Sequence, residues 1–289
     1  MLAAIWGLSF SFIKIASPEF GSFALAFMRI ILAAIFLFAA IVISGQTNTL
    51  IALIFKSELR WHLFISGLLG QLLPFILFAK AELTISASSA SILNATTPIW
   101  SVIVAYVWLK THVSLLKLLG IILSFIGVSI LVGYTSVSDN NSNASILGSG
   151  AILLATFCYA YSSNYLKKYL NQTPPLQVAT ASTIYAAFAG LPLAIYTWPT
   201  TEISVQAWHA TLLLGFLCTG FAFILFFELI AKVDATSAVS VTFLIPIFGV
   251  LWGINYLDEQ ITITTIIAML VILAGVVMSN FPQRKLSSN

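Results

Sequence analysis

The chain has 289 residues, of which 60% are hydrophobic and only 7% carry a charge, whereas soluble domains hold about 25% charged residues. With a mean hydropathy of +1.04, no soluble fold could bury this apolar surface and still present a polar shell, so the solvent must be lipid. The net charge of +3 does not indicate a nucleic-acid partner, and both cysteines lie inside apolar runs, which excludes a disulfide framework.

Ten stretches qualify as membrane-crossing helices, for which about 20 mostly apolar residues are needed. In chain order they cover residues 2–16, 22–44, 61–83, 86–109, 115–134, 147–166, 177–197, 208–230, 236–257 and 261–281. Turn-forming pieces separate them, among them Ser17-Pro18 and the Asn-rich stretch after Ser138. We therefore predict an all-α integral membrane protein with ten transmembrane helices.

The chain also contains an internal repeat, because residues 148 positions apart match without a gap. The stretch from Thr84 to Leu109 corresponds to the stretch from Lys232 to Leu257, and Pro98-Ile99 falls on Pro246-Ile247. Glycines outside these stretches, such as Gly67 and Gly215, match under the same shift. We therefore expect two repeats of five helices each, covering residues 1–134 and 147–281.

The distribution of basic residues predicts the orientation in the membrane. The loops that share a side with both termini hold nine of the twelve Lys and Arg residues, namely Lys56, Arg60, Lys110, Lys117, Lys167, Lys168, Lys232, Arg284 and Lys285. Loops rich in Lys and Arg remain on the cytoplasmic side. We therefore expect both termini in the cytoplasm, and a multi-pass protein of a bacterial inner membrane.

Five helices per repeat is an odd number, so the second repeat must enter the membrane with the opposite orientation. Inverted repeats around a midplane site are a recurring plan of secondary transporters, which open to each side in turn. This pattern favours a transporter, with a channel-like facilitator or a membrane-embedded enzyme as alternatives. We do not expect an enzyme, because the sequence lacks motifs such as HExxH and GxSxG and has no paired intramembrane aspartates.

The residues resemble the EamA family of the drug/metabolite transporter (DMT) superfamily over essentially the whole chain. The resemblance is carried by Trp6-Gly7 with Lys14, Arg29, the small-residue run to Pro98, Tyr159-Ala160 with Lys167, the run to Pro246, Leu257-Asp258-Glu259 and Gly275. It implies transport of amino acids, related metabolites or drugs, mostly as efflux. Thr111 stands where the family ends its fourth helix with an acid, and only Glu259 keeps that acid, so we assign the acid no coupling role.

Polar residues at membrane depth are costly and usually face a cavity. In the fourth expected helix, Asn94 lies one turn before Pro98, which removes a backbone hydrogen bond at that point, and Thr97 borders the same face. Pro246 repeats this break, with Thr242 one turn before it. Gln71 and Pro74 form a similar pair, for which helix kinking is an equal alternative. We expect these residues along the substrate path, although close helix packing also explains small polar side chains.

Two cations of the first repeat are further candidates for the substrate path. Arg29 lies about 10 Å below the start of its helix at 1.5 Å per residue, a depth at which it needs a partner or water. Arg can hold a carboxylate with two parallel hydrogen bonds, so Arg29, helped by Lys14, is a candidate for recognising the acidic end of an amino acid. The alternatives are a structural ion pair between Arg29 and Glu82, or a side chain that reaches the outer surface.

The sequence thus predicts a secondary transporter that exports an amino acid or a related metabolite. Its expected partners are a small-molecule substrate and the lipid bilayer, with no nucleic acid, and the sequence does not indicate an oligomeric state. We expect no cofactor and no metal, because His62, His112 and His209 all lie at helix ends.

The predicted orientation can be tested by labelling single cysteines with a membrane-impermeant maleimide in intact cells. We expect a cysteine at Ser142 to react from outside and a cysteine at Ser288 to react only after the membrane is opened, because of these two positions only Ser142 is expected outside. Labelling in the reverse pattern would contradict the orientation and the inversion of the repeats that depends on it.

Overall fold

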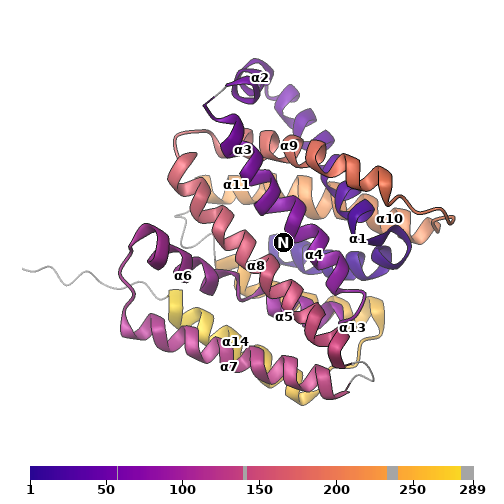
Figure 1. Cartoon of the computed structure of the whole chain (residues 1–289), viewed down its shortest axis with the longest axis vertical. Helices are drawn as coiled ribbons and strands as arrows, with labels where there is room; N and C mark the ends of the chain where they lie inside the picture. Colours follow the sequence, from indigo (N-terminus) through magenta and orange to yellow (C-terminus); the bar gives the residue numbers. More distant parts are fainter. Residues whose placement is uncertain (57, 139–141, 233–239, 281–289) are drawn as a thin grey trace, which may run out of the picture.

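The computed structural model describes residues 1–56, 58–138, 142–232 and 240–280, and within these ranges it contains helices and no strand (Figure 1). The first half contains α1 (Leu2–Ile43), α2 (Thr47–Phe55), α3 (Arg60–Gly67), the π-helix η1 (Leu68–Leu72), α4 (Leu73–Ala81), α5 (Ala87–Asn94), α6 (Thr97–Leu109) and α7 (Leu115–Ser138). The second half contains α8 (Ser142–Tyr169), α9 (Pro175–Tyr196), α10 (Val205–Gly215), the π-helix η2 (Phe216–Phe221), α11 (Ala222–Lys232), the 3-10 helix η3 (Ser240–Leu244), α13 (Ile245–Leu257) and α14 (Ile263–Asn280). The all-helical fold confirms the predicted class.

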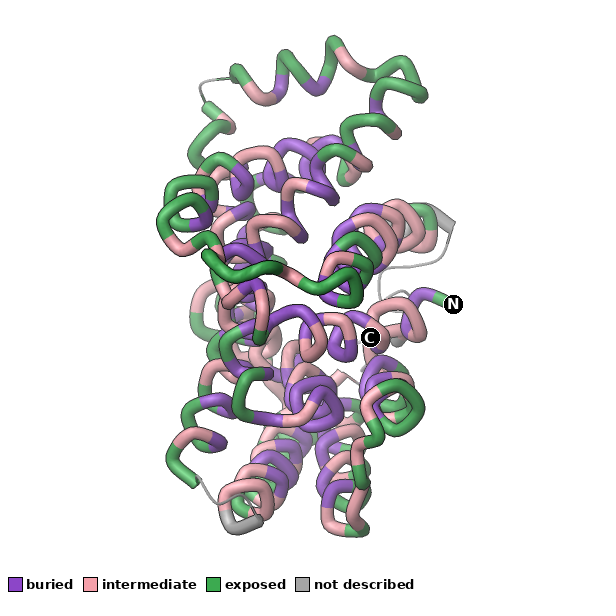
Figure 2. Tube along the Cα trace, turned by 90° about the vertical axis from the view of Figure 1, so that its right-hand side faces the viewer, coloured by how far each residue is buried: buried purple, intermediate pink, exposed green. Residues whose placement is uncertain are grey.

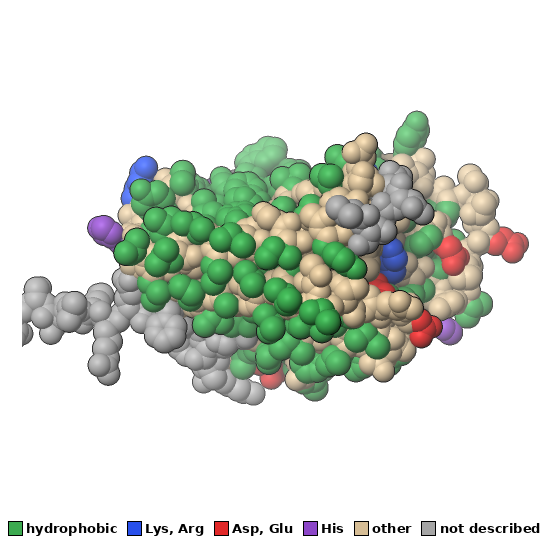
Figure 3. Space-filling model, turned by 90° about the horizontal axis from the view of Figure 1, so that it is seen from below, with side chains coloured by type: hydrophobic (Ala, Val, Ile, Leu, Met, Phe, Trp, Pro, Cys, Tyr) green, Lys and Arg blue, Asp and Glu red, His purple; other side chains and the backbone are tan. Residues whose placement is uncertain are grey.

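The helices suit a membrane by length and by the nature of their outer faces. Eight of those in the described ranges are long and apolar enough to cross a bilayer, and Val241–Leu257 is a shorter apolar one. Large apolar side chains such as Ile122 and Ile126 on α7 and Leu270 on α14 are exposed, and hydrophobic side chains spread over this face between charged ends (Figure 3). The chain is therefore a multi-pass membrane protein.

The first two expected segments lie within α1, which is broken at Gly21. This glycine has φ 70° and ψ 168°, a backbone conformation that essentially only glycine adopts. Pro18, three residues earlier, removes one backbone donor from the same region. The two sides of the break correspond to the expected segments 2–16 and 22–44.

The short helix α2 lies in the connection after α1, where the sequence predicts no membrane-crossing segment. Leu50 and Leu53 of α2 are buried against Ile41 and Leu63, while the opposite side, including Ile51 and Phe55, is exposed. Figure 2 shows these exposed turns at the top of the molecule. The stretch is too short to cross a bilayer, so a search for membrane spans passes over it.

The internal repeat is visible in the irregular parts of the backbone. The π-helices η1 and η2 begin at Leu68 and Phe216, which are 148 residues apart. Lys110 and Asp258, which are also 148 residues apart, end α6 and α13 in the left-handed conformation, with φ of 56° and 53°. Irregular features that recur at the same shift indicate that the two halves fold in the same way.

Corresponding helices of the two halves also pack on each other. The helices α7 and α14 lie side by side (Figure 1), and the hydroxyl of Ser124 donates to the carbonyl oxygen of Ile272, its counterpart in the second half, at 3.1 Å. A Cβ atom on Gly275 would lie 2.5 Å from the carbonyl oxygen of Gly120. Small residues thus allow two backbones to approach closely where lipid provides no hydrophobic drive.

We expect Gly21→Ala to lower the free energy of unfolding in mixed detergent micelles by about 1–3 kcal/mol, because alanine cannot adopt the Gly21 conformation without strain. A Cβ atom at Gly21 would meet open space, so the cost would come from the backbone alone. Gly150→Ala, in open space within α8, is the matched control and should be neutral or stabilising. Equal free energies of unfolding for the two variants, measured by circular dichroism, would contradict the claim that the Gly21 conformation requires glycine.

Candidate functional site

A cavity of about 440 Å³ lies inside the helix bundle, and both halves of the chain contribute to its wall. Five of the predicted site residues line it, namely Arg29, Asn94, Thr97, Pro98 and Thr242, together with Trp6, Ser9, Phe10, Ile13, Gly70, Phe75, Phe78, Ala95, Ser101, Tyr159, Ala160, Ser163, Cys218, Phe223, Phe226, Ile245 and Asn280. The wall is mostly apolar, with a few polar groups that converge on the same space. This composition is typical of sites that bind small molecules.

The break in the fourth expected helix forms one side of the cavity. The helix α5 ends at Asn94, and α6 begins at Thr97 with Pro98 in its first turn. The hydroxyl of Thr97 donates to the carbonyl oxygen of Asn94 at 2.8 Å, and the hydroxyl of Thr96 lies 2.8 Å from the carbonyl oxygen of Leu93. Hydroxyl groups thus satisfy carbonyl groups at the point where the proline interrupts the helix.

The second half contains the corresponding break. The 3-10 helix η3 ends at Leu244, and α13 begins at Ile245 with Pro246 in its first turn. Thr242, which lies on η3, lines the cavity, while Pro246 is buried and is not part of the lining. The two breaks therefore meet the same cavity from opposite halves of the chain.

Arg29 is the only charged residue in the described lining of the cavity, and its side chain is held from two directions. Its Nε atom donates to the hydroxyl oxygen of Thr219 at 2.8 Å, and its Cζ atom lies 3.7 Å from the centre of the Phe75 ring. Among the described residues, no hydrogen bond reaches either of its two Nη groups. These groups provide paired donors for an anion in the cavity.

Neither structural alternative for Arg29 is present in the described part of the chain. The residue is 7% exposed, so it does not reach the surface, and it forms no ion pair with Glu82. Its partner Thr219 was missed by the sequence analysis. Thr219 is the counterpart of Gln71 under the shift of 148 residues, so the repeat contained the information needed to find it.

Lys14 and Gln71 lie outside the lining of the cavity. The Nζ atom of Lys14 donates to the carbonyl oxygens of Glu82 and Ile85 at 2.6 and 2.8 Å, which ties α1 to the turn before α5. Gln71 lies on η1 and is buried, and its Oε1 atom has no hydrogen-bond partner among the described residues.

The carboxylate of Glu259 binds the N-terminus of α5, next to the turn that Lys14 contacts. The two oxygens of Glu259 accept hydrogen bonds from the backbone N–H groups of Ala87 and Ser88 at 2.7 and 3.0 Å. An acid at a helix N-terminus is stabilised by the unpaired N–H groups and by the helix dipole. Glu259, to which the sequence assigns no coupling role, thus joins the second half of the chain to α5 of the first.

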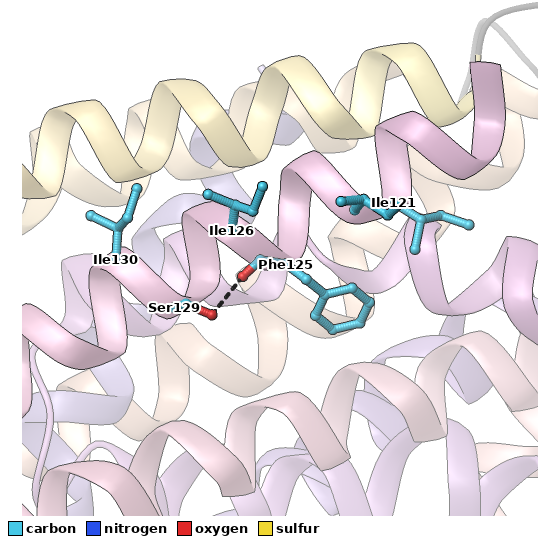
Figure 4. A pocket seen from close by; sticks show the side chains of 6 residues that line it. Ile121, Phe125, Ile126, Ser129 and Ile130 are labelled. Atoms are coloured by element: carbon cyan, nitrogen blue, oxygen red, sulfur yellow. Dashed lines mark hydrogen bonds between the residues drawn. The ribbon is translucent and has the colours of Figure 1, made fainter. Parts of the chain in front are cut away.

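A second hollow of about 550 Å³ lies along α7 and is lined by Ile121, Ile122, Phe125, Ile126, Ser129 and Ile130. Figure 4 shows that the hydroxyl of Ser129 points to the carbonyl oxygen of Phe125 on its own helix, and the two oxygens are 2.9 Å apart. With six residues from a single helix and no polar group available for a ligand, this hollow is a groove on the apolar flank.

The described residues also contain no group of His, Cys, Asp and Glu side chains that could hold a metal ion.

Comparison with known families gives a direct match over most of the chain. The model of the EamA-like transporter family matches twice, at residues 1–133 and 146–281. A solved crystal structure has the same fold, with a TM-score of 0.67 over 96% of this chain and 94% of that chain at 16% sequence identity.

Relatives are found in archaea, bacteria and plants. An uncharacterized transporter of Archaeoglobus fulgidus is 28% identical over 97% of this chain and 95% of its own. The uncharacterized transporter YoaV of Bacillus subtilis is 22% identical over 96% of this chain and 93% of its own. The chloroplastic WAT1-related protein At3g02690 of Arabidopsis thaliana is 23% identical over 96% of this chain and 67% of its own.

Proposed function

Because the chain belongs to the EamA-like transporter family, and is thus a transporter of small molecules, we propose that it exports an amino acid or a related metabolite by alternating access. The size of the cavity supports a small substrate. Its volume of about 440 Å³ lies within the range of about 300–1,000 Å³ that is usual for ligand pockets.

The proposal depends on one observation, that the Arg29 guanidinium group is fixed in the cavity while its two Nη groups have no partner among the described residues. The hydroxyl of Thr219 and the ring of Phe75 fix the guanidinium group, while no described residue takes its two Nη groups. A guanidinium group with two parallel free donors matches the two oxygens of a carboxylate. Because the group is held in place before the substrate arrives, binding loses little side-chain entropy.

Three further polar residues of the cavity lie at the two helix breaks, where we place the other end of the substrate. Asn94 and Thr97 border the break in the first half, and Thr242 lies beside the break in the second. Main-chain groups near helix breaks at membrane depth are a frequent means of coordinating substrates in transporters. The proposed substrate thus has a carboxylate at Arg29 and a polar group near the two prolines.

The architecture supports alternating access. We assign residues 1–134 and 147–281 to two five-helix repeats of opposite orientation, with both termini in the cytoplasm of a bacterial cell. The matched irregularities of the backbone and the pairing of α7 with α14 follow the shift of 148 residues. Two repeats that enclose one cavity can tilt relative to each other and expose it to each side in turn.

The role of Arg29 is tested in proteoliposomes with a panel of radiolabelled amino acids and their decarboxylated amine analogues. We expect Arg29→Gln to raise the KM for the transported amino acid at least tenfold, a loss of about 1.4 kcal/mol, because the paired donors to the carboxylate are gone. Competition by the amine analogues should be unchanged. Arg60→Gln, at an exposed arginine at the start of α3, is the matched control and should behave as the wild type.

Three outcomes would contradict separate parts of the proposal. An unchanged KM in a well-folded Arg29→Gln protein would rule out carboxylate recognition by this residue. Failure of the wild-type protein to transport any amino acid of the panel would contradict the proposed substrate class. Current that rises in proportion to voltage, without saturation by substrate, would indicate a channel.

A further inference from the structure

Glu82 is the one acidic side chain in the described part of the chain that is completely buried, and it lies immediately after α4. Neither of its carboxyl oxygens has a hydrogen-bond partner among the described residues, and it forms no ion pair with them. Leaving an ionised carboxylate in this state costs several kcal/mol. A protonated carboxyl group avoids the larger part of this cost.

The position of Glu82 relates it directly to the cavity. Phe10 and Phe78 line the cavity and contact each other edge to face, with ring centres 5.7 Å apart. Lys14 follows Phe10 by four residues on α1, and Glu82 follows Phe78 by four residues, so each lies about one helical turn, or about 5.4 Å, further along. Lys14 and Glu82 thus each lie one helical turn beyond an aromatic ring of the cavity wall.

The charged groups around Glu82 come from three parts of the chain. Lys14 and Arg29 act on it from α1, and Glu259 acts from the segment after α13, while Lys80 on its own helix is exposed. Lys14 has three N–H donors, of which two are used by backbone carbonyl oxygens, including that of Glu82 itself. The ammonium group therefore lies beside the residue without being paired to its carboxyl group.

Burial outweighs the two cations. Glu82 lies just past the candidate membrane span Arg60–Ala81, and burial raises the pKa of its carboxyl group well above the usual range. The charge of Glu259 acts in the same direction, whereas Lys14 and Arg29 oppose it.

We propose that Glu82 is a proton-binding site of the transport cycle, protonated in the conformation seen here and deprotonated when this end of the bundle opens to water. This proposal rests on the proposed transport function and adds a proton that is bound and released in each transport cycle. Opening would separate the contact of Phe10 with Phe78 and release Glu259 from α5. Water would then take the proton from the carboxyl group, and the resulting carboxylate would pair with the nearby ammonium group of Lys14.

The site is tested first without any substrate, by infrared spectroscopy of the full chain reconstituted in lipid at neutral pH. We expect the carbonyl stretch of a protonated carboxylic acid in the wild type, its loss in Glu82→Gln, and its disappearance from the wild type as the pH is raised. Glu202→Gln, which changes an exposed acid, should leave the band unchanged. In the wild type, 13C-labelled glutamate should shift the band, which identifies it as glutamate even when a variant folds poorly.

A wild-type spectrum without this band, or a band that persists in Glu82→Gln, would overturn the proposal. Transport provides the second measurement, in proteoliposomes with and without a pH gradient. We expect the gradient to stimulate amino-acid uptake by the wild type and to have no effect on Glu82→Gln, which should still exchange substrate at equal pH on both sides. Equal stimulation of the two proteins would also overturn it. A wild type that shows the band and transports no amino acid would contradict the proposed substrate and leave the proton site intact.

Discussion

In the hydrocarbon of a bilayer, every backbone N–H and carbonyl group must find its partner inside the protein. This chain interrupts two helices at prolines, before Pro98 and before Pro246, so each interruption requires polar side chains nearby. Thr96 and Thr97 supply hydroxyl groups to carbonyl oxygens at the first interruption. The polar groups of the cavity wall beside the two prolines are thus a consequence of breaking helices in lipid, and the proposed substrate site depends on them.

The doubling of the chain brings the two interruptions to one cavity, but the two halves carry different charges. Arg29 and Glu82, the charged residues that are buried in the described part of the chain, both lie in the first half, and Glu82 corresponds to Ile230 under the shift of 148 residues. Buried charge is therefore concentrated in the first half. A backbone with internal symmetry thus encloses a cavity whose described lining takes its one charged residue, Arg29, from the first half.

The sequence predicted the features that depend on local composition. Apolar length predicted the membrane-crossing stretches, and the prolines predicted the breaks that border the cavity, which Asn94, Thr97 and Thr242 line. The partners of charged side chains were not predictable in this way, because they lie far apart in the chain. Arg29 was expected to have Glu82 as a possible partner, yet it donates to Thr219, 190 residues away, and Lys14 contacts backbone carbonyl groups outside the cavity.

The central claim is that this cavity opens to each side of the membrane in turn. Its most direct test is a single cysteine in place of Ala95, which lines the cavity, in a protein whose Cys158 and Cys218 are replaced by serine. The account predicts that a membrane-impermeant maleimide reacts with this cysteine both in right-side-out cells and in inside-out vesicles, and that a transported amino acid slows both reactions. Labelling from one side only, under every substrate condition, would contradict alternating access.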